Sequence, residues 1–267
     1  MATSTRERAA DVALRLIPAE HHRARWSDLA ELGFAVIGFL AYFLVRGAVV
    51  TRAADALDHA RDIVRLEIDL GLFIEPQIQH WVLSSPVFWG IANFVYFWCD
   101  FPLIVAVGLL LFWRRRDQYT KLRDSLLLSG AFALLIYMTF PVAPPRFLAE
   151  WGFVDTLEVF SNLSYQAQSL HPFVNQYAAV PSLHVGWSVL LAVAVFRSTP
   201  HWYWRGGMLL VLAVQLVAVI GTGNHFIFDG LVGIAVCLAA LEITDAMHRS
   251  SYPAVRRRIH RWSHVGR

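Results

Sequence analysis

The chain has 267 residues, of which 57% are hydrophobic and 16% are charged, with a net charge of +3 and a mean hydropathy of +0.47. Soluble globular chains are about 45 to 50% apolar and about 25% charged, so the composition excludes a soluble domain, a disordered segment and a coiled coil. It indicates a membrane protein, and so mild a positive charge does not favour nucleic acid as a partner.

Six stretches of the chain are apolar enough to be candidate membrane spans. A span needs about 20 residues, and several of the six are near the lower limit. They lie near 29–50, 86–112, 125–140, 180–196, 206–222 and 226–247. The sequence therefore predicts an all-α, polytopic membrane protein. We expect one six-helix transmembrane bundle over residues 29–247, a basic N-terminal tail over 1–28 and a basic C-terminal tail over 248–267.

The basic residues predict how these spans are oriented. Of the 23 lysines and arginines, 18 fall in the two tails and in the loops after the second and fourth spans, and the other five fall on the opposite side. Cytoplasmic loops carry the excess of such residues in membrane proteins. We therefore expect both termini in the cytoplasm and the loops after the first, third and fifth spans outside.

The first outer segment, 51–85, is long and mixes charged with apolar residues. Its apolar residues recur on one helical face, and charged residues occupy another. The apolar face consists of Ala56, Leu57, Ala60, Val64 and Ile68. This pattern predicts helices that lie at the outer interface as a lid or girdle, with direct substrate contact as the alternative.

The second span carries polar residues at membrane depth. Asn93, Tyr96 and Asp100 are spaced three and four residues apart, which places them on one helical face. They either pack against a polar partner inside the bundle or line a pocket for a lipid or an acceptor.

The second outer segment, 141–179, begins with prolines that end the third span and place Arg146 at the outer surface. Its planar guanidinium suits phosphate oxygens, although an interfacial anchor is the alternative. Just after the segment, Pro181 suits the first turn of a helix, and His184 falls within that turn. Free amides at a helix start favour an anion, so we expect a phosphate cradle with an imidazole beside it. A purely structural histidine is the alternative.

His225 and Asp229 stand four residues apart where the sixth span begins. At this spacing the carboxylate can hold one imidazole nitrogen and leave the other as a more basic nucleophile, whereas a satisfied buried pair is the alternative. All three clusters fall on the same predicted side. One cation, an anion-binding helix start and two imidazoles with a carboxylate are the groups needed for phosphoryl transfer through a covalent histidine, and we expect no metal and no cofactor.

The runs Pro181-Ser182-Leu183-His184 and Gly223-Asn224-His225, followed by Asp229, resemble the motifs of the type 2 phosphatidic acid phosphatase superfamily. The resemblance is specifically to its inositolphosphotransferase branch, which includes fungal inositol phosphorylceramide synthases and many bacterial proteins. It covers residues from about 86 to 247 and is weaker at Glu67, Gly71, Leu72, Phe73 and Glu75. The resemblance implies a six-helix bundle, and we expect it in a bacterial plasma membrane with the active site on the extracytoplasmic side.

The resemblance also implies a role for each residue of these motifs. His225 would be the nucleophile that attacks phosphorus, Asp229 would orient it, and His184 would protonate the leaving oxygen. The residues implied to bind phosphate oxygens are Arg146, Ser182 and Asn224. The chain departs from the superfamily pattern at Thr139 and Val219, where a lysine and an arginine are usual, and relatives in the branch carry a histidine where Asp100 stands.

Loss of two cations weakens the binding of a phosphate monoester, with nearly two negative charges, more than that of a diester with one. We therefore expect an integral membrane phosphotransferase that moves a phosphoryl-linked head group, such as inositol phosphate, from a phospholipid to a lipid alcohol. A lipid phosphate phosphatase of the same superfamily is the second interpretation, and a non-catalytic scaffold or transporter the third. The expected partners are these lipids and the bilayer, and the sequence defines no oligomeric state.

Overall fold

The computed structural model describes residues 26–48, 52–156 and 175–265, and the regular elements of these residues are helices. Four helices contain stretches long and apolar enough to cross a membrane. They are α2 (Trp26–Ala48), α7 (Arg116–Thr139), α10 (Trp202–Gly221) and α11 (Ile227–Val265). The all-helical membrane protein is confirmed, but four of the described helices meet the span criteria, whereas we predicted six spans.

The two remaining predicted spans are shorter or divided. The helix α9 (Leu183–Ser198) has only 16 residues. The stretch 86–112 forms α5 (Pro86–Phe94), a π-helical turn η1 (Val95–Cys99) and α6 (Asp100–Arg114). Pro102 supplies a physical reason for the division, because its ring clashes with the carbonyl four residues earlier, which lies within η1.

The third span begins earlier than predicted. Because α7 starts at Arg116, Lys121 and Arg123 lie on this helix and not in the preceding loop. Acidic residues of α2 make this arrangement favourable: Arg116 pairs with Asp28 at 3.0 Å, and the buried Arg123 pairs with Glu31. Likewise α11 continues to Val265, so the predicted C-terminal tail begins within a helix. Most of the predicted N-terminal tail lies outside the described residues.

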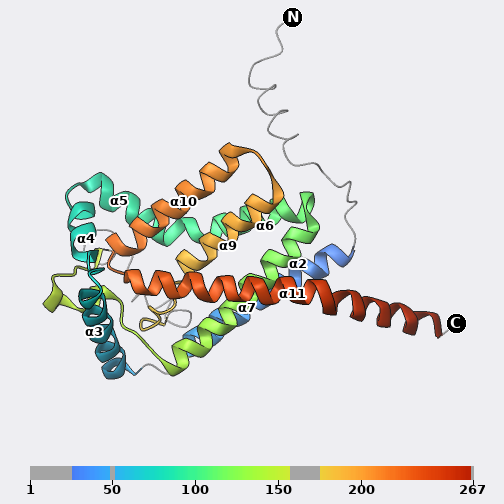
Figure 1. Ribbon diagram of the computed structural model, residues 1–267, viewed down its shortest axis with the longest axis horizontal. Coiled ribbons are helices and arrows are strands. Elements are labelled where there is room, and N and C mark those ends of the chain that lie inside the picture. Colours follow the sequence, from blue (N-terminus) through green and yellow to red (C-terminus); the bar gives the residue numbers. More distant parts are fainter. Residues whose placement is uncertain (1–25, 49–51, 157–174, 266–267) are drawn as a thin grey trace, which may run out of the picture.

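The outer segment 51–85 forms two helices, α3 (Ala53–Asp69) and α4 (Glu75–Leu83). Figure 1 shows them at the end of the bundle opposite to the projecting C-terminal part of α11. Ala56, Ala60 and Val64 of the predicted apolar face are fully buried and join a core cluster formed mainly by the loop after α7. Ile68 is 45% exposed, however, and the neighbouring Glu67 is buried in its place.

The central helix of the bundle is α9, which contacts α6, α7, α10 and α11. Its approach to α11 is close because both helices have a glycine at the crossing: a Cβ atom added at Gly186 would lie 2.6 Å from the carbonyl oxygen of Gly233. The start of α9 is fixed from another side, since Tyr137 of α7 donates a hydrogen bond of 2.9 Å to the carbonyl of Pro181. These contacts position the residues that begin α9.

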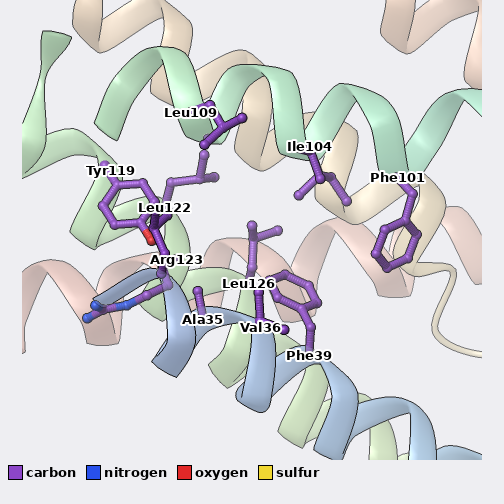
Figure 2. Close-up of a pocket in the computed structure, with 13 residues that line it drawn as sticks. Ala35, Val36, Phe39, Phe101, Ile104, Leu109, Tyr119, Leu122, Arg123 and Leu126 are labelled. Carbon is purple, nitrogen blue, oxygen red and sulfur yellow. The ribbon is translucent and has the colours of Figure 1, made fainter. Parts of the chain in front are cut away.

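An apolar cavity lies between α2, α6 and α7 (Figure 2). Phe39, Phe101 and Leu126 line it, and Tyr119 and Arg123 lie at one end. Tyr119 is near the start of α7, roughly 30 Å from the end of that helix. The polar end of this cavity is therefore far from the end of the bundle at which the predicted site residues lie.

Candidate active site

The predicted catalytic residues and Arg146 come together at one end of the bundle. The starts of α9 and α11 meet there with the ends of α2, α7 and α10. The ring of His184 lies 5.9 Å from that of His225, measured between centroids. Tyr96 of η1 stacks on His184 at 4.6 Å and lies 6.4 Å from His225. Two imidazoles predicted from separate motifs are thus neighbours.

The contacts of His225 define which of its ring nitrogens carries the proton. Its Nδ1 lies 3.0 Å from the carbonyl oxygen of Ala179 and 3.3 Å from Asp229 Oδ2. A carbonyl oxygen only accepts, so Nδ1 is the protonated nitrogen and donates to it. The other nitrogen, Nε2, then carries the lone pair. Asp229 is fully buried and also accepts a hydrogen bond of 2.9 Å from the amide of Phe226.

The surroundings of His225 keep its imidazole neutral. Burial, together with the nearby positive charge of Arg146, lowers the pKa of His225 to about 3, against an ordinary value of 6.5. The ring is therefore unprotonated over the whole physiological pH range. A neutral imidazole with its lone pair on Nε2 is the form that can attack phosphorus.

A tight turn between α10 and α11 carries His225. Gly223 adopts φ +69°, a left-handed conformation that favours glycine. The amides of Asn224 and His225 both donate to the carbonyl of Val219, each at 3.1 Å. A Cβ atom at Gly223 would also lie 2.8 Å from Gln79 Nε2 and 3.1 Å from the carbonyl oxygen of Val154. Both the backbone conformation and the available space thus require a glycine.

We expect Gly223→Ala to destabilise the protein by more than Gly71→Ala does. Gly71 also has a positive φ, +68°, but a Cβ atom there would meet nothing within 4 Å. Both variants should therefore show the conformational cost of roughly 1–2 kcal/mol, and only Gly223→Ala should show a steric cost and a loss of turnover as well. Thermal unfolding in detergent and lipid turnover measure the two effects. Equal behaviour of the two variants would contradict this account of the turn.

Arg146 is held by several contacts in the loop after α7. Its Nη1 donates to Asn224 Oδ1, and its Nε pairs with Asp155 Oδ2 at 3.1 Å. Its backbone amide donates to the carbonyl of Gly223 at 2.8 Å. Asn224, which we predicted to bind phosphate, instead uses both polar groups inside the protein, because its Nδ2 donates to Thr222 Oγ1 at 2.8 Å. The geometry of Asn224 is that of a residue that orients Arg146, and its contact with phosphate stays a prediction.

Arg146 and His225 line a small pocket, and a second arginine lines it with them. This arginine was not identified from the sequence as a site residue. Arg46, in the last turn of α2, lines the pocket together with Tyr96, Arg146 and His225. The sequence showed Arg46 only as an outer cation, since nothing local relates it to residues a hundred positions later. The two positions at which the superfamily pattern carries cations do not line this pocket. The side chain of Thr139 is exposed and hydrogen-bonds to a carbonyl of its own helix. Val219 is 1% exposed and belongs to an apolar cluster.

Ser182 precedes the first residue of α9, as the predicted phosphate cradle requires. Its side chain is fully buried, and its Oγ has no hydrogen-bond partner among the described residues. Its amide donates to the backbone carbonyl of Asp229 at 2.9 Å, which joins the starts of α9 and α11. A buried hydroxyl without a partner at a helix start is available to an anion, and contact of Ser182 with phosphate stays a prediction.

Two buried glutamates hold the start of α11. Glu67 Oε1 accepts from the amide of Phe228 at 2.7 Å, and Glu75 Oε1 accepts from the amide of Ile227 at 2.9 Å. Their side chains are 1% and 0% exposed. The sequence marked both residues only through a weak resemblance and assigned their segment to a lid or girdle. The fold shows that they cap the helix that begins two residues after His225, and the role of their segment as a lid or girdle stays a prediction.

The two glutamates predict a pH dependence of stability. Burial and hydrogen bonding to Glu75 raise the pKa of Glu67 to about 9, against an ordinary value of 4.5. The folded protein therefore holds a proton that the unfolded chain releases, and the free energy of unfolding should fall as the pH rises from 4.5 towards 9. In Glu67→Gln, which keeps a neutral acceptor for Phe228, we expect this decline to be smaller.

Thermal unfolding of the wild type and of Glu67→Gln, measured side by side across this pH range, tests the assignment. Glu242, an exposed glutamate of α11, provides the matched control, and Glu242→Gln should leave the pH dependence of the wild type unchanged. Parallel curves for the wild type and Glu67→Gln would show that Glu67 does not carry the proton.

The three polar residues of the second span have separate surroundings. Asn93 is satisfied inside the protein: its Nδ2 donates to the carbonyl of Thr156 at 3.0 Å, and its Oδ1 accepts from Thr156 Oγ1 at 2.7 Å. Tyr96 lies in the histidine pocket. Asp100 faces a different cavity. Their common role as a lipid or acceptor pocket stays a prediction. Among the described residues, no group of three His, Cys, Asp or Glu side chains could hold a metal ion.

Comparisons with known proteins point to one superfamily. A family model described as "PAP2 superfamily" matches residues 61–243, which is more than half of the chain. The chain is also 26% identical over 192 residues to a protein of Bacteroides thetaiotaomicron named phosphoinositol dihydroceramide synthase. This match covers 64% of the chain and 60% of the relative, so the chain spans less than two thirds of that protein's length. No solved structure matches the chain.

Proposed function

The chain belongs to the PAP2 superfamily, and we propose that it is an integral membrane phosphotransferase that moves a phosphoryl-linked head group between lipids. The observation that carries this proposal is the geometry of His225. Its protonated Nδ1 donates towards Ala179 and Asp229, which leaves the lone pair on Nε2. His225 and two arginines line one pocket, and the ring of His225 lies 5.9 Å from that of His184. These are the groups that a covalent phosphohistidine mechanism requires.

The proposed reaction has two steps that balance in atoms and protons. In the first, His225 Nε2 attacks phosphorus and the bond from phosphorus to the leaving lipid oxygen breaks. His184, whose protonated form the negative charge of the bound phosphate favours, gives that oxygen its proton. In the second, His184 takes the proton of the acceptor hydroxyl, whose oxygen attacks phosphorus while the bond to Nε2 breaks. Arg46, Arg146 and the start of α9 stabilise the charge on the phosphoryl oxygens. His184 thus ends the cycle protonated, as it began.

The charges around the pocket favour a phosphodiester as the donor. Arg46 and Arg146 bring two positive charges, and the carboxylate of Asp155, which pairs with Arg146, brings one negative charge. The sum over these three groups is one positive charge, which matches a diester better than a dianionic monoester. The sequence argument relied on two missing cations. In the pocket Arg46 supplies one positive charge in place of a missing cation, and the negative charge of Asp155 compensates for it.

We propose inositol phosphate as the head group and a lipid alcohol as the acceptor. The support is the similarity to a relative named phosphoinositol dihydroceramide synthase, together with the motifs of the inositolphosphotransferase branch. Six spans, with both termini in the cytoplasm and the site at the outer surface, complete the proposal. In that arrangement α9 and the broken α5–η1–α6 segment cross the membrane beside the four longer helices.

A lipid phosphate phosphatase is the second candidate function, and Arg46 is the observation that favours it, because a second cation improves the binding of a dianion. Purified protein in vesicles, given radiolabelled phosphatidylinositol and a labelled lipid monoester with and without lipid alcohols, separates the two functions. We expect the label of the diester to appear on the added alcohol. Phosphate release from the monoester at a much higher rate would replace the transferase by the phosphatase, and strong inhibition by a chelator would argue against the histidine mechanism.

A further inference from the structure

A second cavity, of about 780 Å³, lies between the η1–α6 segment, α9 and α10. Asp100, Ser188 and Gln215 form the polar part of its lining. The remaining lining is almost entirely apolar and includes Leu103, Ala106, Leu210 and Val211. The cavity thus has a polar group of side chains and a long hydrocarbon surface.

Two of its polar side chains each have a buried atom with no hydrogen-bond partner in the described part of the chain. Asp100 is 8% exposed and its Oδ1 has no hydrogen bond among the described residues, and Gln215 is 2% exposed with an unpartnered Nε2. An unsatisfied polar atom inside a membrane protein is costly, and ionisable residues at membrane depth are usually functional. Both residues line the same cavity, so each has an unsatisfied polar atom next to it, which indicates a ligand with polar groups of its own.

The polar part of the cavity lies just below the histidines. Ser188 follows His184 by one turn of α9, about 6 Å along the helix axis. Asp100 follows Tyr96, which stacks on His184, by four residues. Gln215 lies about 9 Å before the end of α10, and the apolar Leu210 and Val211 lie deeper still. The polar part of the cavity therefore lies about one helical turn from the histidines, and its apolar part lies towards the middle of the bundle.

The rim of the cavity faces the side on which lipid would lie. Phe94, Trp98 and Leu210 line it and are 59%, 52% and 66% exposed in the isolated chain. Exposed aromatic and aliphatic side chains on a membrane helix contact hydrocarbon tails. The apolar side chains at this rim therefore suit a ligand with hydrocarbon tails.

We propose that this cavity holds the acceptor, a lipid alcohol that carries a second hydrogen-bonding group close to its reacting hydroxyl. The proposal rests on the phosphotransferase function proposed above. The hydroxyl reaches His184, the second group lies one helical turn deeper at Asp100 and Gln215, and the tail fills the apolar part. A group that both donates and accepts, such as an amide or a hydroxyl, satisfies Asp100 Oδ1 and Gln215 Nε2 together.

This arrangement makes Asp100 and Gln215 determinants of acceptor specificity. A diacylglycerol has one hydroxyl, which reacts, and its ester carbonyls only accept, so it offers no donor to Asp100 Oδ1. A lipid with an amide and a further hydroxyl offers both. Sites that hydrogen-bond a substrate group reject analogues that lack it more strongly than apolar pockets do. The apolar cavity of Figure 2 has its polar side chains, Tyr119 and Arg123, near the start of α7, so it offers an acceptor no polar side chain near His184.

The test compares two acceptors, dihydroceramide and diacylglycerol, with labelled phosphatidylinositol as the donor and full-length protein in vesicles. We expect Gln215→Met and Asp100→Leu each to lower the ratio of kcat/KM for dihydroceramide over diacylglycerol by about tenfold, since each removes one hydrogen bond to the acceptor. Leu209→Met is the matched control, because Leu209 lies on α10 but does not line the cavity. Its ratio should equal that of the wild type.

Binding of the acceptor can be measured even if a variant loses all turnover, so it provides a second test of the cavity. Labelled dihydroceramide should bind His225→Asn protein and should bind about tenfold more weakly when Gln215→Met is added. An unchanged acceptor ratio or unchanged binding would overturn the cavity assignment. Failure of the proposed function would give a different result. The wild-type protein would then transfer no head group to either acceptor and would release none to water.

Discussion

Replacing His225 by asparagine should lower lipid turnover by at least about 10³-fold, because the variant has no nitrogen lone pair that can attack phosphorus. Asparagine can keep a hydrogen bond in this turn, so the fold should survive. Turnover of labelled phospholipid in vesicles measures the loss. Rapid acid-free quenching of the wild type should trap labelled phosphorus on the protein, and the variant should carry none.

His201→Asn is the matched control, because His201 directly precedes α10, whose opposite end leads into the turn of His225. Its turnover should remain within about twofold of the wild type, as is usual for a surface substitution away from a site. Turnover of His225→Asn at the wild-type rate would remove the covalent mechanism and favour a non-enzymatic role or a different nucleophile.

Replacing Asp229 by asparagine should lower kcat by roughly 10²- to 10⁴-fold with a smaller change in KM. The asparagine can present its NH₂ group to Nδ1 of His225, which favours the tautomer that protonates Nε2 and so removes the lone pair from the attacking position. The carbonyl of Ala179 still accepts from Nδ1 and opposes this change. We therefore expect a loss nearer the lower limit of that range. The split between kcat and KM measures it.

Asp245→Asn provides a comparison on the same helix, since Asp245 is 7% exposed and pairs with Arg197 at 2.9 Å, far from His225. This variant should lose stability but keep the turnover of each folded molecule. If Asp229→Asn behaved in the same way, Asp229 would be a structural residue and the tautomer argument would be wrong.

The contacts that could be predicted from the sequence are short in range. His225 and Asp229 are four residues apart at a helix start, and a helix geometry alone brings their side chains together. Arg146 and His184 could be assigned to the same side because the basic residues predict an orientation of the spans and because prolines mark the ends of helices. That they lie near each other could be predicted because the motifs occur in the order found in the superfamily and fall on the same predicted side of the membrane.

The contacts that could not be predicted join residues far apart in the sequence. Arg46 reaches the pocket from the first membrane helix, and Glu67 and Glu75 bond to amides about 150 residues later. No periodicity reports such a contact, and a glutamate in a mixed-charge segment appears solvent-exposed in sequence. The division of the second span was also missed, although Pro102, whose ring accounts for it, stands in the sequence, because a proline within an apolar run does not by itself show whether the helix bends or ends.

The close crossing of α9 and α11 at Gly186 and Gly233 bears on how the protein responds to its bilayer. Backbones in direct contact cannot slide or spread without separation of the whole crossing, so the two helices move as one unit. A thicker or more fluid membrane can tilt that unit or change how easily a lipid reaches it, but it leaves the spacing of the imidazoles nearly constant. Differences in rate between vesicles of different composition should therefore arise from substrate entry, not from the bond-making step.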